Sequence, residues 1–440
     1  MIFMKKYIWR LSMKIQGVKI DGYKNIYNAS FCFNEITALV ALNNFGKSNV
    51  LSAINFGTTF IRENEEKRNR MMSNGTVVPI NKKIASRNFS FEMELLTEEN
   101  NETYRLIYGY QFEWNRDDDK GCRIVKEYLK SKLDQKGQRY GLLISRDDKG
   151  GLYKSTETGR CTAEILIEDN ELVLNKIKAF DSLYYAFIIK KMNKIRLYLE
   201  ENFDVRSCYL PDLFVKKSLS DLNVDEDNLP RIIYHIKDKY TNYFEQLIDA
   251  YKSLFPQIED IIVREIKVKK EGIMEIPDDL PFQVSANYYL LYVNDNNLNQ
   301  PIDFRAMSDG TKRVFMILTR IIVANIENVA LIAIEEPENS VHPSLLQDYL
   351  QIISSFLGDC KVIITSHSPY IINYLNLKDV YIGLSRECGV AEFFNIRKKC
   401  LRALENDAQS VDMSNGDYIF TLLSNDSEEL LKYLECDANE

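Results

Sequence analysis

The sequence lacks the features that mark several classes of protein. No run of about eighteen apolar residues occurs among the 440, so a membrane span is not expected. The eight cysteines are scattered without a CxxC pair and only three histidines are present, which argues against disulfides and zinc. We therefore expect free thiols in a reducing cytoplasm. The first twelve residues lack the apolar core of a signal peptide, and we expect them to lie outside the fold.

A surplus of positive charge is also missing. The formal net charge is −8, from 56 basic and 64 acidic residues. This charge argues against a body covered in nucleic-acid-binding surface, although it is compatible with a local basic groove. Apolar residues make up 45% of the chain, whose length suits one large domain with an insert, or two domains.

Hydrophobic patterning divides the chain into three parts. Residues 13–172 read as a strand, a loop and a helix, followed by alternating, antiparallel strands. Residues 173–260 carry apolar side chains at helical spacing and predict a helical insert. Residues 261–440 alternate apolar strands with punctuated helices, which is typical of an α/β protein with a parallel sheet.

Three shorter segments receive more specific predictions. Residues 62–85 are polar and charged, and we interpret them as a surface loop. Residues 183–203 and 231–255 space their apolar side chains three and four apart, which predicts helices.

The stretch ALNNFGKS, residues 41–48, lies between the apolar strand ITALV and a helical pattern. Backbone N–H groups of such a loop, together with the helix N-terminus, attract phosphate oxygens. Lys47 can reach the β- and γ-phosphates, and the Ser48 hydroxyl can bind Mg²⁺. The other residues that we expect to contact the nucleotide are Asn43, Asn44, Gly46 and Asn49.

Two carboxylates and a histidine follow buried strands later in the chain. Glu335 and Glu336 end the run VALIAIEE, and His367 follows KVIIT. Open α/β sheets bind ligands at the carboxyl ends of their strands, so the three side chains are expected to meet at one edge. Glu335 can hold Mg²⁺ through water, while Glu336 can deprotonate an attacking water. The alternative for the glutamates alone is a charged strand end that faces solvent.

A second anion-binding turn lies in FRAMSDGTKRV. Ser308 and Gly310 precede a helix and offer a hydroxyl and backbone N–H groups. A chain with one phosphate loop has no evident use for a second within the same molecule. We therefore expect this turn to contact the nucleotide of another subunit.

Taken in the order in which they occur along the chain, the motifs resemble those of ABC-type ATPases of the soluble SMC/RecF/OLD-like group. More narrowly, they resemble the AAA15/AAA21-type ATPases of bacterial phage-defence systems, such as the PARIS, Septu and OLD families. The matching segments are ALNNFGKS as Walker A, MSDGT as signature, LIAIEEPEN as Walker B with D-loop, and ITSHSP as switch histidine. Lys24 in KIDGYKNI is the counterpart of a basic residue near the nucleotide. Departures from the family pattern are Ala41, Phe45, Asp309 and Glu335.

The resemblance implies an ABC-type P-loop ATPase head with a parallel core sheet, an antiparallel β-element and a short helical insert. It implies Mg²⁺-dependent ATP hydrolysis, with Glu336 and His367 as catalytic residues, by a homo-oligomer in which two subunits enclose two ATP molecules. It also implies a regulatory role in anti-phage defence. The residues after His367 show no acidic metal cluster of the TOPRIM kind, so we expect a separate effector protein to be the nuclease.

Two alternatives stay open. A RecF-like DNA-repair ATPase would bind DNA directly through basic clusters such as residues 264–270, which a solvated strand face also explains. A non-catalytic scaffold would use ATP only as a clamp, and the altered loop residues keep this reading open. Salt-dependent DNA binding would favour the first alternative, and a turnover assay tests the second.

Overall fold

The computed structural model describes residues 13–73, 78–116, 120–200, 207–210, 212–216, 222, 228–268, 280–425 and 427–434. The expected N-terminal extension lies outside these residues. No helix in the described ranges is long and apolar enough to cross a membrane.

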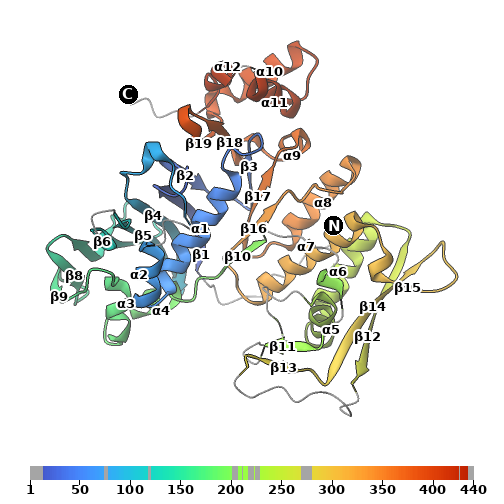
Figure 1. Ribbon diagram of the computed structural model, residues 1–440, viewed down its shortest axis with the longest axis horizontal. Helices are drawn as coiled ribbons and strands as arrows, with labels where there is room; N and C mark the ends of the chain where they lie inside the picture. The colour runs from blue at the N-terminus through green and yellow to red at the C-terminus, as the bar shows by residue number, and fades with distance from the viewer. Residues whose placement is uncertain are drawn as a thin grey trace.

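A six-stranded sheet runs through the centre of the molecule (Figure 1). Its first five strands are parallel and only the last pair is antiparallel, which confirms the parallel core predicted from the apolar strands. In spatial order the strands are β10 (Leu197–Glu200), β16 (Leu331–Glu335), β17 (Lys361–Ser366), β3 (Ile36–Val40), β18 (Val380–Ser385) and β19 (Ala391–Asn395). Every residue of β3 is buried, as expected of a strand covered on both faces.

An eight-stranded antiparallel sheet forms the N-terminal side of the molecule. In spatial order it contains β2 (Ala29–Cys32), β1 (Lys14–Asp21), β4 (Phe89–Glu99), β5 (Glu102–Glu113), β6 (Arg123–Leu133), β7 (Gly141–Asp147), β8 (Gly150–Lys154) and β9 (Cys161–Ile165). Buried and partly exposed residues alternate along most of β4, so one face packs inward. The alternation predicted from the sequence is confirmed.

Helix α1 (Lys47–Arg62) covers the buried face of this sheet. Gly57 allows the close approach, because a Cβ there would lie 2.5 Å from the Phe91 ring. The Tyr110 hydroxyl donates to the Gly57 carbonyl at 2.8 Å. The helix that begins at the phosphate loop is thereby fixed to the antiparallel sheet.

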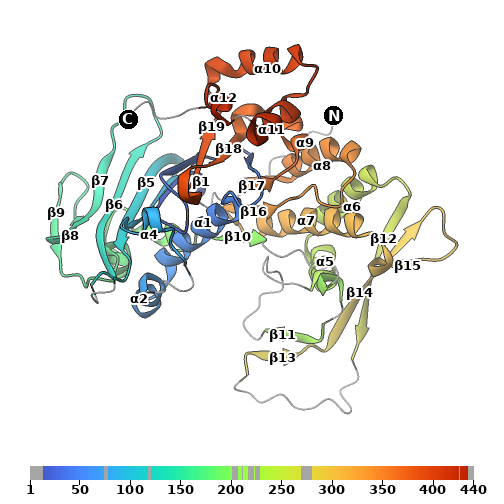
Figure 2. The same ribbon diagram turned by 45° about the horizontal axis from the view of Figure 1, so that its top comes forward.

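Helices α7 (Asp309–Ile326) and α8 (Pro343–Phe356) pack against one face of the central parallel sheet. The helical insert lies next to them, and beyond it the chain forms a three-stranded sheet and a short pair of strands (Figures 1 and 2). These elements are α5 (Leu229–Lys239), α6 (Thr241–Leu254), β12 (Ile258–Lys267), β14 (Asn287–Asp295), β15 (Ile302–Asp303), β11 (Phe214–Lys216) and β13 (Phe282–Val284). Residues 231–255, expected to be helical, form α5 and α6, which are separated at Tyr240.

The last part of the chain forms a small helical group beside β18 and β19 (Figure 2). It consists of α9 (Pro369–Tyr374), α10 (Leu401–Ser410), α11 (Asn415–Asn425) and α12 (Ser427–Leu431). Short 3-10 helices span Lys82–Ile84, Ile177–Ala179, Ser207–Tyr209, Phe304–Ala306, Leu377–Asp379, Glu387–Gly389 and Lys398–Cys400. The boundaries expected between the three parts of the chain, at residues 172/173 and 260/261, stay a prediction.

Two segments differ from the sequence-based expectation. Within residues 62–85, interpreted as a loop, the chain forms helix α2 (Glu65–Ser73). Within residues 183–203, interpreted as one helix, α4 (Ala186–Met192) is followed by strand β10. The second segment becomes a strand because it pairs in parallel with β16, a tertiary contact that local periodicity does not report.

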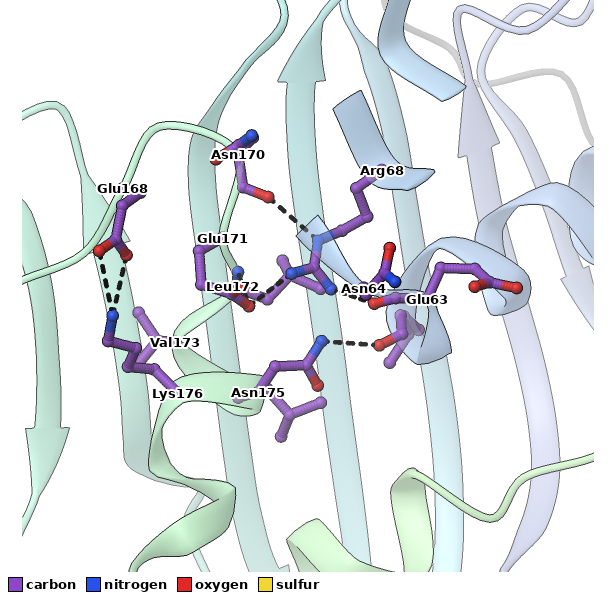
Figure 3. A network of polar contacts seen from close by, with 12 residues as sticks. Glu63, Asn64, Arg68, Glu168, Asn170, Glu171, Leu172, Val173, Asn175 and Lys176 are labelled. Atoms are coloured by element: carbon purple, nitrogen blue, oxygen red, sulfur yellow. Dashed lines mark hydrogen bonds and ion pairs between the residues drawn. The ribbon is translucent and has the colours of Figure 1, made fainter. Parts of the chain in front are cut away.

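A buried arginine explains the unexpected helix α2 (Figure 3). Arg68 is 1% exposed and donates to the Asn170 carbonyl at 3.0 Å and to the Glu63 carbonyl at 2.5 Å. Its guanidinium also pairs with the Glu171 carboxylate at 2.5 Å. These bonds tie α2 to the chain that leads into α3 (Val173–Lys176). A polar side chain therefore does the anchoring that an apolar stripe performs in most surface helices.

Candidate functional site

The phosphate loop has the conformation that its sequence predicts. It follows β3 directly, and α1 begins at Lys47. Asn44 and Gly46 have left-handed backbones, with φ of 64° and 89°. A Cβ on Gly46 would also lie 2.8 Å from the methyl group of Ala391, so glycine is needed here for space as well as for φ. The backbone N–H groups at the start of α1 thus provide an anion site.

The unusual alanine at the start of the loop is accommodated by a glycine on the next strand. Ala41 is fully buried, and a Cβ on Gly383 of β18 would lie 2.9 Å from its methyl group. The methyl group therefore fills the space that a side chain at Gly383 would need. Phe45, the second departure, is only partly exposed.

Lys47 lies inside the loop rather than in solvent. It is 8% exposed, and its ammonium donates to the carbonyls of Ala41 at 2.7 Å and Leu42 at 3.1 Å. Burial lowers the pKa of Lys47, while Glu336 and Glu335 oppose that shift. The lysine and the predicted carboxylates therefore act on one another electrostatically, as members of one site do.

The turn after β1 contributes further polar groups to the start of α1. The Lys24 ammonium lies 3.4 Å from the Ser52 hydroxyl, one turn along from the loop. The amide of Asn49 donates to the Asn25 side chain at 2.8 Å, so it holds this turn against the helix. Asn43, Asn44 and Ser48 are exposed at the loop surface.

Glu336 and His367 form a direct pair. Their side chains meet at 2.9 Å between Oε1 and Nδ1, and both are partly exposed to solvent. Glu336 has a left-handed backbone, with φ of 47°, and its N–H donates to the Thr365 carbonyl at 2.8 Å. The Asn339 amide donates to the other carboxylate oxygen at 2.5 Å. This geometry suits a general base whose orientation is fixed by two neighbours.

Strand order explains why these groups meet. Strand β17 lies between β3 and β16 and is parallel to both. Val40, the last residue of β3, is opposite Ser366 of β17, and Thr365 is opposite Glu335 of β16. The phosphate loop, the histidine and the glutamates therefore leave the sheet at one carboxyl edge.

The sequence reasoning missed a third carboxylate, Glu338. Its Oε1 accepts a hydrogen bond from the hydroxyl of Ser366, which is completely buried, and its Oε2 is shielded from solvent. Burial raises the pKa of Glu338, and its bond with Ser366 opposes the shift. The signal was present as the third acidic residue of EEPE, following the same strand as the other two.

Ser308 and Gly310 lie where α7 begins, on the far side of the acidic turn. The Ser308 hydroxyl caps the helix by accepting from the Thr311 N–H at 3.2 Å. A Cβ on Gly310 would lie 2.0 Å from the Ser340 carbonyl oxygen, so the signature and the D-loop are in direct backbone contact. Within the described part of the chain, no hydrogen bond joins Ser308 or Gly310 to the phosphate loop of the same molecule.

Arg313 connects the signature helix with the acidic turn. Its guanidinium donates to the carbonyl of Glu335 at 2.8 Å and to that of Glu336 at 3.0 Å. Burial lowers the pKa of Arg313. Arg313 therefore joins the first turns of α7 to the backbone that carries the glutamates.

The residues present suit a magnesium ion that is bound mainly by nucleotide and water. Among the described residues no group of three or more His, Cys, Asp or Glu side chains is arranged to hold a metal. Ser48 is exposed at the start of α1, and Glu335 is partly exposed at the end of β16. A hydroxyl and one carboxylate, completed by phosphate oxygens and water, are the oxygen ligands that Mg²⁺ prefers.

Solved structures with similar folds include two SMC heads and one RecF. The SMC head bound to the C-winged helix domain of ScpA has a TM-score of 0.44 and 13% identity, covering 88% of this chain and 99% of that chain. The SMC head domain from Thermotoga maritima has a TM-score of 0.42 and 12% identity, covering 87% and 99%. The recombination mediator protein RecF-ATPrS of the RecFOR pathway has a TM-score of 0.38 and 11% identity, covering 88% of this chain and 100% of that chain. No curated protein matches the sequence.

A family model matches residues 36–373, which contain the phosphate loop, the signature turn, the acidic turn and the switch histidine. The match covers well over half of the chain and confirms the expected resemblance to AAA21-type ATPases. The chain belongs to the AAA_21 family, described as "AAA domain, putative AbiEii toxin, Type IV TA system".

Proposed function

We propose that the chain binds ATP with Mg²⁺ and hydrolyses it. The observation that carries this proposal is that the loop of Lys47 and the Glu336–His367 pair leave the sheet at the carboxyl edge of three adjacent parallel strands. Lys47 and the N–H groups of the loop bind the phosphates, since the loop is shaped around left-handed Asn44 and Gly46. A bound Mg²⁺ would supply charge neutralisation for the β- and γ-phosphates, held by Ser48 and by Glu335 through water.

Glu336 accepts the proton of the attacking water in this proposal. Its Oε1 faces His367 and its Oε2 faces Asn339, so the carboxylate is oriented before the substrate arrives. His367 shares the hydrogen bond with Glu336 and would contact the γ-phosphate. A positioned general base contributes about 10²- to 10⁴-fold in rate.

We further propose that two copies of the chain share each site. Ser308 caps an eighteen-residue helix that contains Gly310, and among the described residues no hydrogen bond joins this turn to the phosphate loop of the same chain. Facing the γ-phosphate held by Lys47 of a second copy, they would complete the anion site.

Mixing two damaged chains tests the shared site. Ser308→Arg and Lys47→Ala chains are each expected to be inactive alone, because each lacks one half of both sites in its homodimer. A mixed dimer pairs the intact Lys47 of one chain with the intact Ser308 of the other, so partial ATPase activity should reappear. Absence of activity in mixed dimers whose formation has been demonstrated would contradict the shared site.

The role that we propose for this cycle is the regulation of a separate effector in anti-phage defence, with a nuclease as the expected class. The support is the family, whose description names a putative AbiEii toxin of a type IV toxin–antitoxin system. Purification of the chain from its native host with and without the Glu336→Gln change tests this role. A partner retained only in one of the two states would support regulation by the nucleotide.

One observation favours direct DNA binding as a second candidate function. Lys126, Lys130 and Lys132 line the outer face of β6, where the first two lie over the Tyr128 ring at 5.6 and 5.0 Å. Among the described residues, none of the three lysines is within ion-pairing distance of a carboxylate, although Lys130 helps to lower the pKa of the Glu92 carboxyl. Replacing all three lysines by glutamate should abolish any salt-dependent DNA binding. DNA binding that survives this change would place the contact elsewhere.

A further inference from the structure

Glu338, whose Oε2 is shielded from solvent, joins two segments that both carry catalytic candidates. The turn after β16 contains Glu336 and Glu338, while Ser366 ends β17 and His367 begins the loop that follows it. The Ser366 hydroxyl donates to Glu338 and is completely buried. The same hydroxyl oxygen accepts the N–H of Ser368 at 2.9 Å. Ser366 therefore binds Glu338 on one side and sets the path of the loop around His367 on the other.

These bonds complete a closed ring of contacts. Glu336 and His367 meet through their side chains at 2.9 Å, while the N–H of Glu336 reaches Thr365 at 2.8 Å. Glu338 lies two residues after Glu336, Ser366 lies between Thr365 and His367, and the Glu338–Ser366 bond closes the ring. The Glu336–His367 pair is thus held between a backbone bond and a partly buried side-chain bond. Loss of either bond would leave the imidazole free to rotate away from the carboxylate.

We infer that Glu338 is a positioning residue that holds His367 against Glu336 through Ser366. This inference rests on the proposed hydrolysis at the same site. Stability alone does not account for a carboxyl in this place, because burying it costs free energy that an apolar side chain of similar size would not. Its Oε2 is shielded from solvent without a hydrogen-bond partner among the described residues, which adds to that cost. Such a group is retained where geometry matters more than stability.

The backbone of the acidic turn is held independently of Glu338. Arg313 binds the carbonyls of Glu335 and Glu336, and the Asn339 N–H binds the Glu336 carbonyl at 3.0 Å. Removal of the Glu338 carboxyl should therefore leave Glu336 in place and release mainly the loop of His367. ATP binding at Lys47 should be unaffected, so the expected defect is in kcat and not in KM.

The kinetic test uses three variants and a matched control. Glu338→Ala and Ser366→Ala should each lower kcat by on the order of 10- to 100-fold, with an unchanged KM for ATP, because small misplacements of reacting groups have effects of this size. The double variant should be no slower than either single variant, because both changes remove the same hydrogen bond between Glu338 and Ser366. Glu338→Gln keeps an acceptor for Ser366 and should restore most of the activity.

Ser368→Ala serves as the control in the same loop. Its hydroxyl caps α9 by accepting the Tyr370 N–H at 3.3 Å and does not contact Glu338. This variant should keep the wild-type kcat. Folded Ser366→Ala and Glu338→Ala chains with wild-type kcat would overturn the inference. A Glu338→Gln chain as slow as Glu338→Ala would overturn it too, because the charge and not the position would then be required.

A second readout keeps the test independent of ATP turnover. Nitrogen-15 NMR reports the hydrogen bonding of Nδ1 of His367, whose signals are identified by their loss in a His367→Asn chain. Glu338→Ala and Ser366→Ala should change the Nδ1 signal, whereas Ser368→Ala should not. A wild-type chain that does not hydrolyse ATP would contradict the proposed function, and the nitrogen spectrum would still decide the positioning. Unchanged Nδ1 signals in both variants would overturn the inference.

Discussion

A single methyl group at Gly310 should uncouple the signature turn from the catalytic edge. In Gly310→Ala the new Cβ would lie 2.0 Å from the carbonyl oxygen of Ser340, whereas Cβ atoms in proteins essentially never approach closer than 3.0 Å. The two backbones must therefore separate by about 1 Å, a displacement that can cost on the order of 10²-fold in rate. Neither side yields easily, because Gly310 is buried in the first turn of α7 and Ser340 already has a left-handed φ of 66°.

The effect on stability should be smaller than the effect on turnover. Overpacking of this kind costs about 1–3 kcal/mol, which a chain of this size tolerates. We expect kcat to fall by about 10²-fold, ATP binding by calorimetry to remain, and the chain to unfold at a slightly lower temperature. Gly358→Ala is the matched control, because its Cβ would meet only the side-chain oxygen of Asn325, at 3.1 Å. Near-normal turnover in Gly310→Ala, or an equal loss in the control, would refute this reasoning.

Three further predictions address the loop, the base and the fold. Lys47→Ala should abolish the ATP binding that calorimetry measures, because the phosphate loop would lose its only buried ammonium. An unchanged affinity for ATP would show that the nucleotide binds at another site. Glu336→Gln should retain ATP while slowing hydrolysis by on the order of 10²- to 10⁴-fold, and a slow Glu335→Gln beside a normal Glu336→Gln would reverse the two roles. Arg68→Met should lower the free energy of unfolding, measured in urea, by about 3–5 kcal/mol, because it leaves the partly buried Glu171 carboxylate and the carbonyls of Asn170 and Glu63 without their hydrogen-bond donor. Arg70→Met, which removes an exposed ion pair, is its control and should leave that free energy nearly unchanged.

The elements around the nucleotide could be predicted because their signals are local. The phosphate loop is a continuous stretch that carries its own strand, turn and helix, and the run Val329–Ile334 is apolar enough to require burial on both faces. Helix α8 begins with Pro343 and is followed by Gly358, so both of its ends can be predicted from the sequence. Once the strands are parallel, residues that follow them must share an edge.

The elements that escaped prediction depend on contacts between distant segments. Helix α2 has only two buried residues, Arg68 and Met72, and its arginine is anchored by the chain before α3. Strand β10 has too few residues to show a period, and it is extended because β16 is beside it. Glu338 is one of three acidic residues in EEPE, and the sequence of this stretch does not indicate which carboxyl points inward. The serine that identifies it belongs to another strand.

The order of the strands also determines how the site responds to the rest of the molecule. Strand β3 comes from the N-terminal part of the chain, yet it is inserted between β17 and β18 of the C-terminal part. Lys47 and Glu336 therefore come to the same edge because both parts share one sheet. The phosphate-loop helix is fixed to the antiparallel sheet through Gly57, while the acidic turn is fixed to the signature helix through Arg313. In the proposed function, a nucleotide bound between these groups would contact both parts at once, so its binding and release would act on both sides of the molecule.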